Sequence, residues 1–168
     1  TATAATGINR DQGFLASDVG RLLRFQGGDG AWREYEIRTR ISATQVTARL
    51  KGEPLLDLKG TTQWRLGYWS ETTGWPMVGD FFEDRLWLAG SIEAPDLICG
   101  SVTGSYEEFR QTDSQGEVLD DNALALRLNS RKMSRIMWLS SDTRGMLIGT
   151  GSEEYTLSAG NGESVTAR

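Results

Sequence analysis

The stretch Arg85-Leu86-Trp87-Leu88-Ala89-Gly90-Ser91 decides the fold class, and Leu97-Ile98-Cys99-Gly100-Ser101 follows it closely. Both are short apolar runs that end in glycine and a small polar residue, which is typical of β-strands bounded by turns. The aromatic and acidic segment Gly104–Phe109 then closes the unit as a turn. Two such strands and a turn are typical of one part of a β-propeller blade. The pattern therefore predicts a mostly β chain.

Further strands are expected towards the C-terminus, at Ala123–Asn129, Arg135–Ser141, Met146–Thr150 and Glu154–Ser158. A weak internal echo relates residues 85–91 to residues 145–152, because both runs are apolar and end in glycine plus a small polar residue. The offset is about 60 residues, longer than the roughly 40–50 of common propeller repeats. Residues 75–168 are therefore predicted to form incomplete β-propeller-type blades.

Residues 14–74 alternate between apolar and polar side chains with a period near two, which predicts a small antiparallel β-barrel or sandwich. A slip in the alternation near Tyr35 suggests a bulge, and Pro54–Gly60 fits either a strand or one helical turn. The small, polar residues 1–13 are expected to be a linker or a frayed end. Gly74-Trp75-Pro76 breaks regular structure, so a domain junction is placed there. The expected strands are Arg21–Phe25, Ala31–Ile41, Gln45–Leu50 and Trp64–Trp69.

Composition excludes several kinds of chemistry. The 168 residues carry a net charge of −5, one cysteine and no histidine. Without histidine the common zinc sites and the histidine-activated nucleophiles are excluded, and without a second cysteine there is no internal disulfide. Cys99 is expected to be a small buried residue in a strand. We therefore expect no enzyme activity, cofactor, metal or small-molecule ligand.

Partners and context follow from the same features. No apolar run approaches the roughly 20 residues that cross a bilayer, so no membrane partner is expected. The acidic balance leaves only passive contact with DNA, as in a channel wall. The chain begins Thr-Ala-Thr without methionine, so we expect it to be a piece of a longer protein.

The order of motifs resembles the nozzle proteins at the tail tip of short-tailed bacteriophages and related tail-hub proteins. The resemblance covers most of the chain beyond residue 14, and its motifs are Gly74-Trp75-Pro76, Phe81–Gly90, Tyr106–Phe109, Asp120–Leu124, Ile136–Leu139 and Leu147–Tyr155. It implies a virion component that is assembled in the host cytoplasm and forms a ring, typically of six copies, around the genome-ejection channel. Its partners would be other copies of itself and neighbouring tail proteins. A complete nozzle protein is several times longer, so two or so blades would leave faces and edges that more protein must cover.

Paired carboxylates raise the alternative of a glycoside hydrolase fragment, because such enzymes use two of them. Adjacent residues of a strand point to opposite faces, so each pair presents at most one carboxylate per face. Solvated turns are therefore the preferred interpretation. Asp120-Asp121-Asn122 lacks the spacing of a calcium loop and is interpreted as a turn. The acidic pairs are Glu107/Glu108, Asp120/Asp121 and Glu153/Glu154.

Six tryptophans raise the alternative of a carbohydrate- or receptor-binding tail module, through an exposed stacking platform. Trp87 and Trp138 lie in apolar strands and are expected in the core. Trp75, beside glycine and proline, is the best candidate for an exposed contact. The only local concentration of positive charge could form a subunit interface, face DNA or simply be solvated, and consists of Arg127, Arg131, Lys132 and Arg135. The favoured function is a structural ring subunit in tail assembly and genome ejection.

Overall fold

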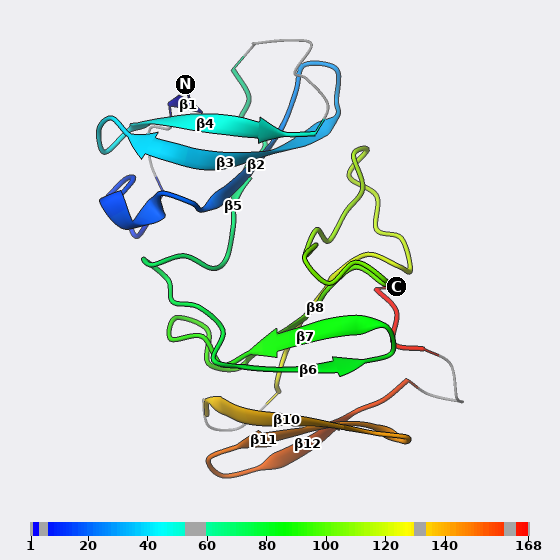
Figure 1. The fold of residues 1–168 in the computed structure, drawn as a ribbon. Coiled ribbons are helices and arrows are strands. Elements are labelled where there is room, and N and C mark those ends of the chain that lie inside the picture. The colour runs from blue at the N-terminus through cyan, green and yellow to red at the C-terminus, as the bar shows by residue number, and fades with distance from the viewer. Residues whose placement is uncertain (1, 4–6, 53–59, 130–133, 160–163, 168) are drawn as a thin grey trace. The chain divides into compact units, whose positions relative to one another are not determined.

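A computed structural model describes residues 2–3, 7–52, 60–129, 134–159 and 164–167. The described chain is mostly β, as predicted, and forms three antiparallel sheets (Figure 1). It divides into two compact units. The first unit comprises Thr1–Trp75 with Ser114–Gly116, and the second comprises Pro76–Asp113 with Glu117–Arg168. No helix in the described part of the chain is long and apolar enough to cross a bilayer.

The first unit is built on one five-stranded sheet with the strand order β1-β4-β3-β2-β5. A short 3-10 turn, Ala16–Asp18, precedes the second strand. The register places Leu23 opposite both Tyr35 and Leu66, so these side chains share one face of the sheet. The strands are β1 (Ala2–Thr3), β2 (Leu22–Gln26), β3 (Trp32–Arg40), β4 (Gln45–Lys51) and β5 (Trp64–Leu66).

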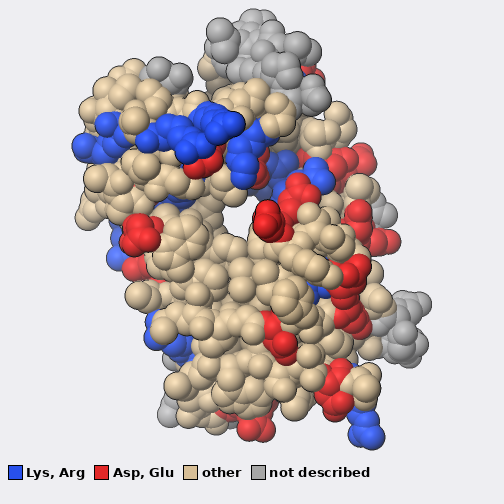
Figure 2. All heavy atoms as spheres, viewed as in Figure 1, with Lys and Arg blue, Asp and Glu red and all other residues tan. Residues whose placement is uncertain are grey.

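The opposite face of this sheet is charged. Arg24 lies between Arg65 and Glu34, and Glu34 in turn faces Lys51 on β4. Figure 2 shows basic side chains gathered over β3 and β4. One apolar face and one solvated face are what the period-two alternation of these strands produces.

The expectation that residues 1–13 form a linker or a frayed end is wrong for the described part of that segment. Ile8 is 3% exposed and packs in the core cluster with Phe14, Ile37 and Val46. The amide of Gly13 donates to the carbonyl of Ile8, and β1 pairs with β4. The chain folds back here through three residues with positive φ, Asn9–Asp11, which composition did not indicate.

The position of the β-bulge and the end of the last strand in this unit differ from the predictions made from the sequence. The β-bulge lies between Ile37 and Thr39 rather than near Tyr35. The strand expected at Trp64–Trp69 ends at Leu66, although the amide of Gly67 still donates in register to the carbonyl of Leu22. Residues 53–59, which include most of the ambiguous segment 54–60, lie outside the described residues.

The second unit contains two sheets whose strands follow one another in chain order. The four-stranded sheet is β6-β7-β8-β9 and the three-stranded sheet is β10-β11-β12. Strand β6 was not predicted, because Gly79 and Asp80 interrupt its apolar pattern. The strands are β6 (Val78–Phe82), β7 (Arg85–Ala89), β8 (Leu97–Gly100), β9 (Leu124–Arg127), β10 (Ile136–Asp142), β11 (Gly145–Thr150) and β12 (Glu154–Leu157).

The two sheets of this unit pack face to face around one apolar core (Figure 1). The amide of Ser141 donates to Asp80 Oδ2 at 2.6 Å, which ties β10 to β6. Cys99 is buried, as predicted. The core is built from Trp87, Ala89, Ile98 and Leu124 of the four-stranded sheet and from Ile136, Met146 and Ile148 of the three-stranded sheet.

Trp87 and Trp138, which both lie in strands of this unit, differ in solvent exposure. Trp87 is fully buried, as predicted, but Trp138 is 39% exposed, so its assignment to the core is wrong. The register shifts between Ile136 and Trp138, which inserts one residue into β10. The extra residue reverses the alternation, so Ile136 points into the core while Trp138 points outward.

Candidate functional site

A buried arginine organises one end of the second unit. Arg85 begins β7, is 2% exposed and reaches the loop between β8 and β9. Its Nη1 donates to the carbonyls of Ser101 at 2.5 Å and Asn122 at 2.7 Å, and its Nη2 donates to that of Asp120 at 2.9 Å. Burial lowers the pKa of Arg85, while the nearby carboxylates of Asp121 and Glu83 partly oppose this effect. The guanidinium therefore fixes the loop that carries Tyr106.

Two exposed aromatic side chains lie beside the turn between β6 and β7: Phe81 comes from β6 and Tyr106 from the loop after β8. Glu83 and Asp84 have φ values of 48° and 56°, as a two-residue type I′ hairpin turn requires. The hydroxyl of Tyr106 donates to Asp84 Oδ1 at 2.8 Å, and this bond raises the pKa of Tyr106. The rings of Phe81 and Tyr106 meet edge to face, with centroids 5.0 Å apart and planes at 79°. We call this pair the aromatic corner.

The outward side of the three-stranded sheet is apolar at its centre. Trp138 lies directly opposite Gly149, and Leu147 lies two residues away on the same face. Met137, at the bulge, is 59% exposed and Leu147 is 41% exposed. We call the surface formed by Met137, Trp138 and Leu147 the outer apolar face. A cluster of large, exposed apolar side chains is more often part of a contact surface than of a solvated surface.

The residues that the sequence singled out do not form one site. Trp75 is 52% exposed, as expected, and its Nε1 donates to Glu71 at 2.8 Å in the first unit. Arg127 is exposed in the second unit and pairs with Asp96 at 2.6 Å. Arg135 is exposed just before β10, whereas Arg131 and Lys132 lie outside the described residues. Trp75 and the two described arginines therefore belong to different units.

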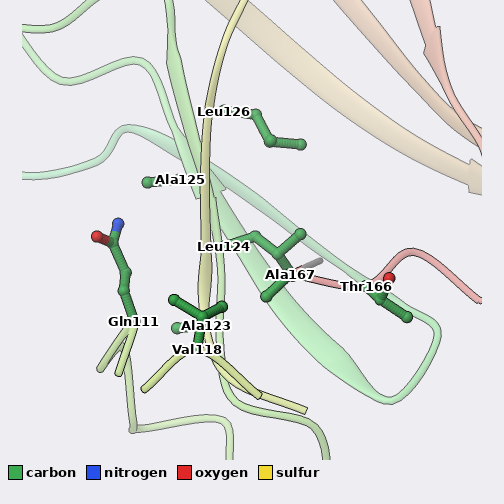
Figure 3. A pocket seen from close by; sticks show the side chains of 8 residues that line it. All are labelled: Gln111, Val118, Ala123, Leu124, Ala125, Leu126, Thr166 and Ala167. Atoms are coloured by element: carbon green, nitrogen blue, oxygen red, sulfur yellow. The ribbon is translucent and has the colours of Figure 1, made fainter. Parts of the chain in front are cut away.

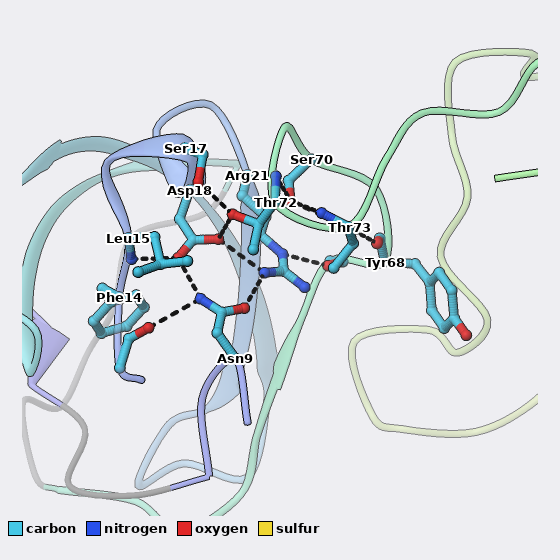
Figure 4. A network of polar contacts seen from close by, with 12 residues as sticks. Asn9, Phe14, Leu15, Ser17, Asp18, Arg21, Tyr68, Ser70, Thr72 and Thr73 are labelled. Carbon is cyan, nitrogen blue, oxygen red and sulfur yellow. Dashed lines mark hydrogen bonds and ion pairs between the residues drawn. The ribbon is translucent and has the colours of Figure 1, made fainter. Parts of the chain in front are cut away.

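A polar network in the first unit, shown in Figure 4, is the most connected group of ionisable side chains there. Asp18 is fully buried and accepts bonds from Asn9, the Leu15 amide, Arg21 and Thr72. Burial raises the pKa of Asp18, but these bonds outweigh it and leave the pKa below the ordinary 3.8.

Arg21 completes the same network. Its Nε donates to the carbonyl of Gly67 at 2.7 Å, and its Nη1 donates to Asn9 Oδ1 at 3.0 Å. The network thus fastens residues 9–21 to the loop that follows β5. Its oxygens are engaged by the protein itself, which gives it a structural role.

A cavity of about 230 Å³ opens beside β9 (Figure 3). Its walls come mainly from alanine, leucine and valine side chains, with Gln111 and Thr166 as the polar contributors. Thr166 contributes a hydroxyl and Gln111 an amide, and the other lining side chains are apolar. The lining therefore offers mainly shape and apolar contact.

The acidic pairs lie on the second unit. Their side chains are exposed, except that Glu108 is half-buried and pairs with Arg110 at 2.7 Å. Among the residues that the structure describes, no three acidic or cysteine side chains could hold a metal ion together. The described surfaces are suited to contact.

No family model matches this chain, and no curated protein matches it significantly.

Proposed function

We propose that this chain is a structural subunit of a bacteriophage tail, in the nozzle or hub ring, and that its second unit supplies propeller-type blades. The order β6-β7-β8-β9 is an antiparallel meander of the size of one blade. The next three strands form a second meander that packs on the first. Consecutive meanders stacked face to face are how neighbouring blades are arranged.

One observation carries the proposal: the four-stranded sheet has apolar side chains on both of its faces. Trp87, Ala89 and Ile98 face the core between the two sheets. On the opposite face, Phe81 lies across from Leu86, and Leu88 lies across from Cys99. A sheet without a polar face belongs inside a stack of layers.

The three-stranded sheet supports the same proposal. Its outer apolar face continues the stack beyond the pair of sheets. Strand β12 is the last strand of this sheet, so a fourth strand added there would complete a blade. More protein, from the ring or from neighbouring tail proteins, would cover these surfaces. The function would be mechanical, through contacts that symmetry repeats around the ring.

The first test of the proposal is self-association. Mass photometry and negative-stain microscopy should show assemblies of several copies, with ring-shaped particles. Leu147→Glu places a charge on the outer apolar face and should weaken assembly at least about tenfold. Ser152→Glu adds the same charge in an exposed turn and is the matched control. A wild-type chain that stays single at tens of micromolar, with no ring, would contradict assembly through this chain alone.

The second test concerns the virion. An antibody raised against this chain should label the tail tip of intact particles of the source phage in electron micrographs. Labelling of the capsid, or of free protein alone, would overturn the assignment to the tail.

A carbohydrate- or receptor-binding module is the second candidate, and one observation favours it. The Trp138 ring is part-exposed on a flat sheet, with Glu154 in the same cross-strand row. On a glycan array, binding that Trp138→Ala abolishes and Trp75→Ala preserves would support this candidate. An array without any bound glycan would count against it.

A further inference from the structure

The aromatic corner is a rigid arrangement that is exposed in the unassembled chain, although Phe81 lies on the sheet face that the proposed stack would cover. Phe81 is 58% exposed and Tyr106 is 42% exposed, although they contact each other. Their planes meet at 79°, so the edge of one ring points at a face of the other. That face is occupied, and the remaining exposed aromatic faces are electron-rich surfaces open to solvent.

The corner is held in place before any ligand arrives. The carbonyl of Asp84 accepts the amide of Gly104 at 2.8 Å, which binds the hairpin turn to the loop that carries Tyr106. The base of that loop is fixed by Arg85. The Tyr106 hydroxyl is in turn anchored on Asp84. A site with so little freedom loses little conformational entropy when it binds.

The edge of the corner is negatively charged. Asp84 is exposed, and its carboxylate oxygen Oδ1 lies 2.8 Å from the hydroxyl oxygen of Tyr106. Glu83 precedes it in the turn, and Glu107 follows Tyr106 in the loop. An anionic ligand would be repelled here, while a cation would meet both a carboxylate and an open aromatic face.

We infer that the aromatic corner, Phe81 and Tyr106 with Asp84, binds an alkylammonium cation. Aromatic faces attract cations through the ring quadrupole, and alkylated ammonium groups also bury apolar methyl or methylene surface against the rings. The carboxylate of Asp84 supplies the full opposite charge. The corner lies on the second unit beside the blade surfaces and adds a ligand to the proposed mechanical function without depending on it.

The experiment compares a cation with its neutral twin. Choline chloride and 3,3-dimethylbutan-1-ol have the same shape, but only choline is charged. Each is titrated into the ¹⁵N-labelled chain, and the amide signals of Phe81, Asp84 and Tyr106 are followed. Choline should saturate these shifts in the millimolar range, and the neutral alcohol should bind at least about fivefold more weakly.

Variants identify the groups that bind. Phe81→Ala and Tyr106→Ala should each weaken choline binding about fivefold, and Asp84→Asn should weaken it by a similar factor. Tyr106→Phe keeps the ring and removes the bond to Asp84, so it should retain more binding than Tyr106→Ala. Met77→Ala removes another exposed apolar side chain of the same unit and should leave binding unchanged.

A further arm distinguishes the sources of the cation. Nα-acetyl-lysine methylamide carries a primary ammonium, as a lysine side chain of a protein partner would, whereas choline carries a quaternary one. Saturation by either, lost in Phe81→Ala and Tyr106→Ala, supports the site and names its ligand. Equal binding of choline and the neutral alcohol, or no saturation by either cation, overturns it.

Discussion

The indole of Trp138 lies flat on Gly149, directly across the β10–β11 strand pair. A Cβ at residue 149 would stand 1.9 Å from Cε2 of the ring, and 2.1 Å and 2.3 Å from Nε1 and Cζ2, two of the ring atoms bonded to Cε2. Such nearly equal distances place the Cβ below the plane of the ring, so the ring covers the glycine. Trp87 and Gly100 show the same cross-strand relation in the core, with Cβ distances of 3.0–3.1 Å.

Gly149→Ala should therefore lift the Trp138 ring from the sheet. We expect a loss of about 1–3 kcal/mol in unfolding free energy, because the methyl group has no room, and stronger quenching of tryptophan emission by acrylamide. Gly151→Ala is the matched control, since a Cβ there would find nothing closer than 3.6 Å. Unchanged quenching in Gly149→Ala would show that the ring does not rest on the glycine.

Arg85→Met should loosen the loop between β8 and β9. The substitution keeps apolar bulk but leaves several buried carbonyls without their donor, which should cost about 3 kcal/mol. Hydrogen exchange of the Thr103 amide, which donates to the carbonyl of Asp121 at 3.0 Å, should quicken. Arg144→Met, at an exposed turn, should leave exchange as in the wild type. Equal exchange rates of the Thr103 amide in both variants would show that Arg85 does not hold this loop in place.

Asp18→Asn should destabilise the first unit by about 3 kcal/mol at pH 7, because the amide NH₂ would face donors. The folded pKa of Asp18 lies below its ordinary 3.8, so its charge stabilises the fold at neutral pH and this contribution is lost as the pH falls through the folded pKa. The gap between the urea midpoints of wild type and variant should therefore stay constant near neutral pH and narrow as the pH falls through 3.8 and below. Asp29→Asn, at an exposed turn, should shift the midpoint less at pH 7. A gap between wild type and Asp18→Asn that widens towards low pH would contradict the assigned charge state.

Cys99 should be inert in the native chain. Burial raises the pKa of its thiol to about 12, with a smaller opposing effect from the charge of Arg127. At pH 8 the aromatic disulfide reagent DTNB should react slowly with the folded protein and rapidly in denaturant, where the thiol pKa returns to about 8.5. In Ser152→Cys the added, exposed thiol should react at once. Rapid reaction of native Cys99 would show that β8 opens readily.

The strands that the sequence predicted well are short, continuous apolar runs bounded by turns. Arg85–Ala89 has the predicted bounds, and β11 differs from its predicted range by one residue. Strand β6 escaped prediction because its pairing partner β7, rather than its own side chains, makes it a strand. The local sequence pattern indicates which side chains are buried, but it does not show the pairing that a neighbouring strand imposes.

The exposed surfaces were harder to predict, for two physical reasons. Trp138 was assigned to the core because it lies in an apolar strand, and one inserted residue turns its side chain outward. The aromatic corner joins Phe81 to Tyr106 across two strands and a loop, so its geometry is a tertiary property. The sequence marked Gly104–Phe109 as aromatic and acidic, but it could not bring the two rings together.

The division between the two units has a practical consequence for dissecting this protein. The chain leaves the first unit at Trp75 and returns to it for Ser114–Gly116, where the carbonyl of Ser114 accepts the amide of Trp32 at 2.7 Å. A truncation after residue 75 would therefore remove Ser114–Gly116, a segment that belongs to the first unit. Isolating the first unit would require a short replacement for residues 114–116. Protease cleavage within this segment should loosen the start of β3 at Trp32 before it affects either sheet of the other unit.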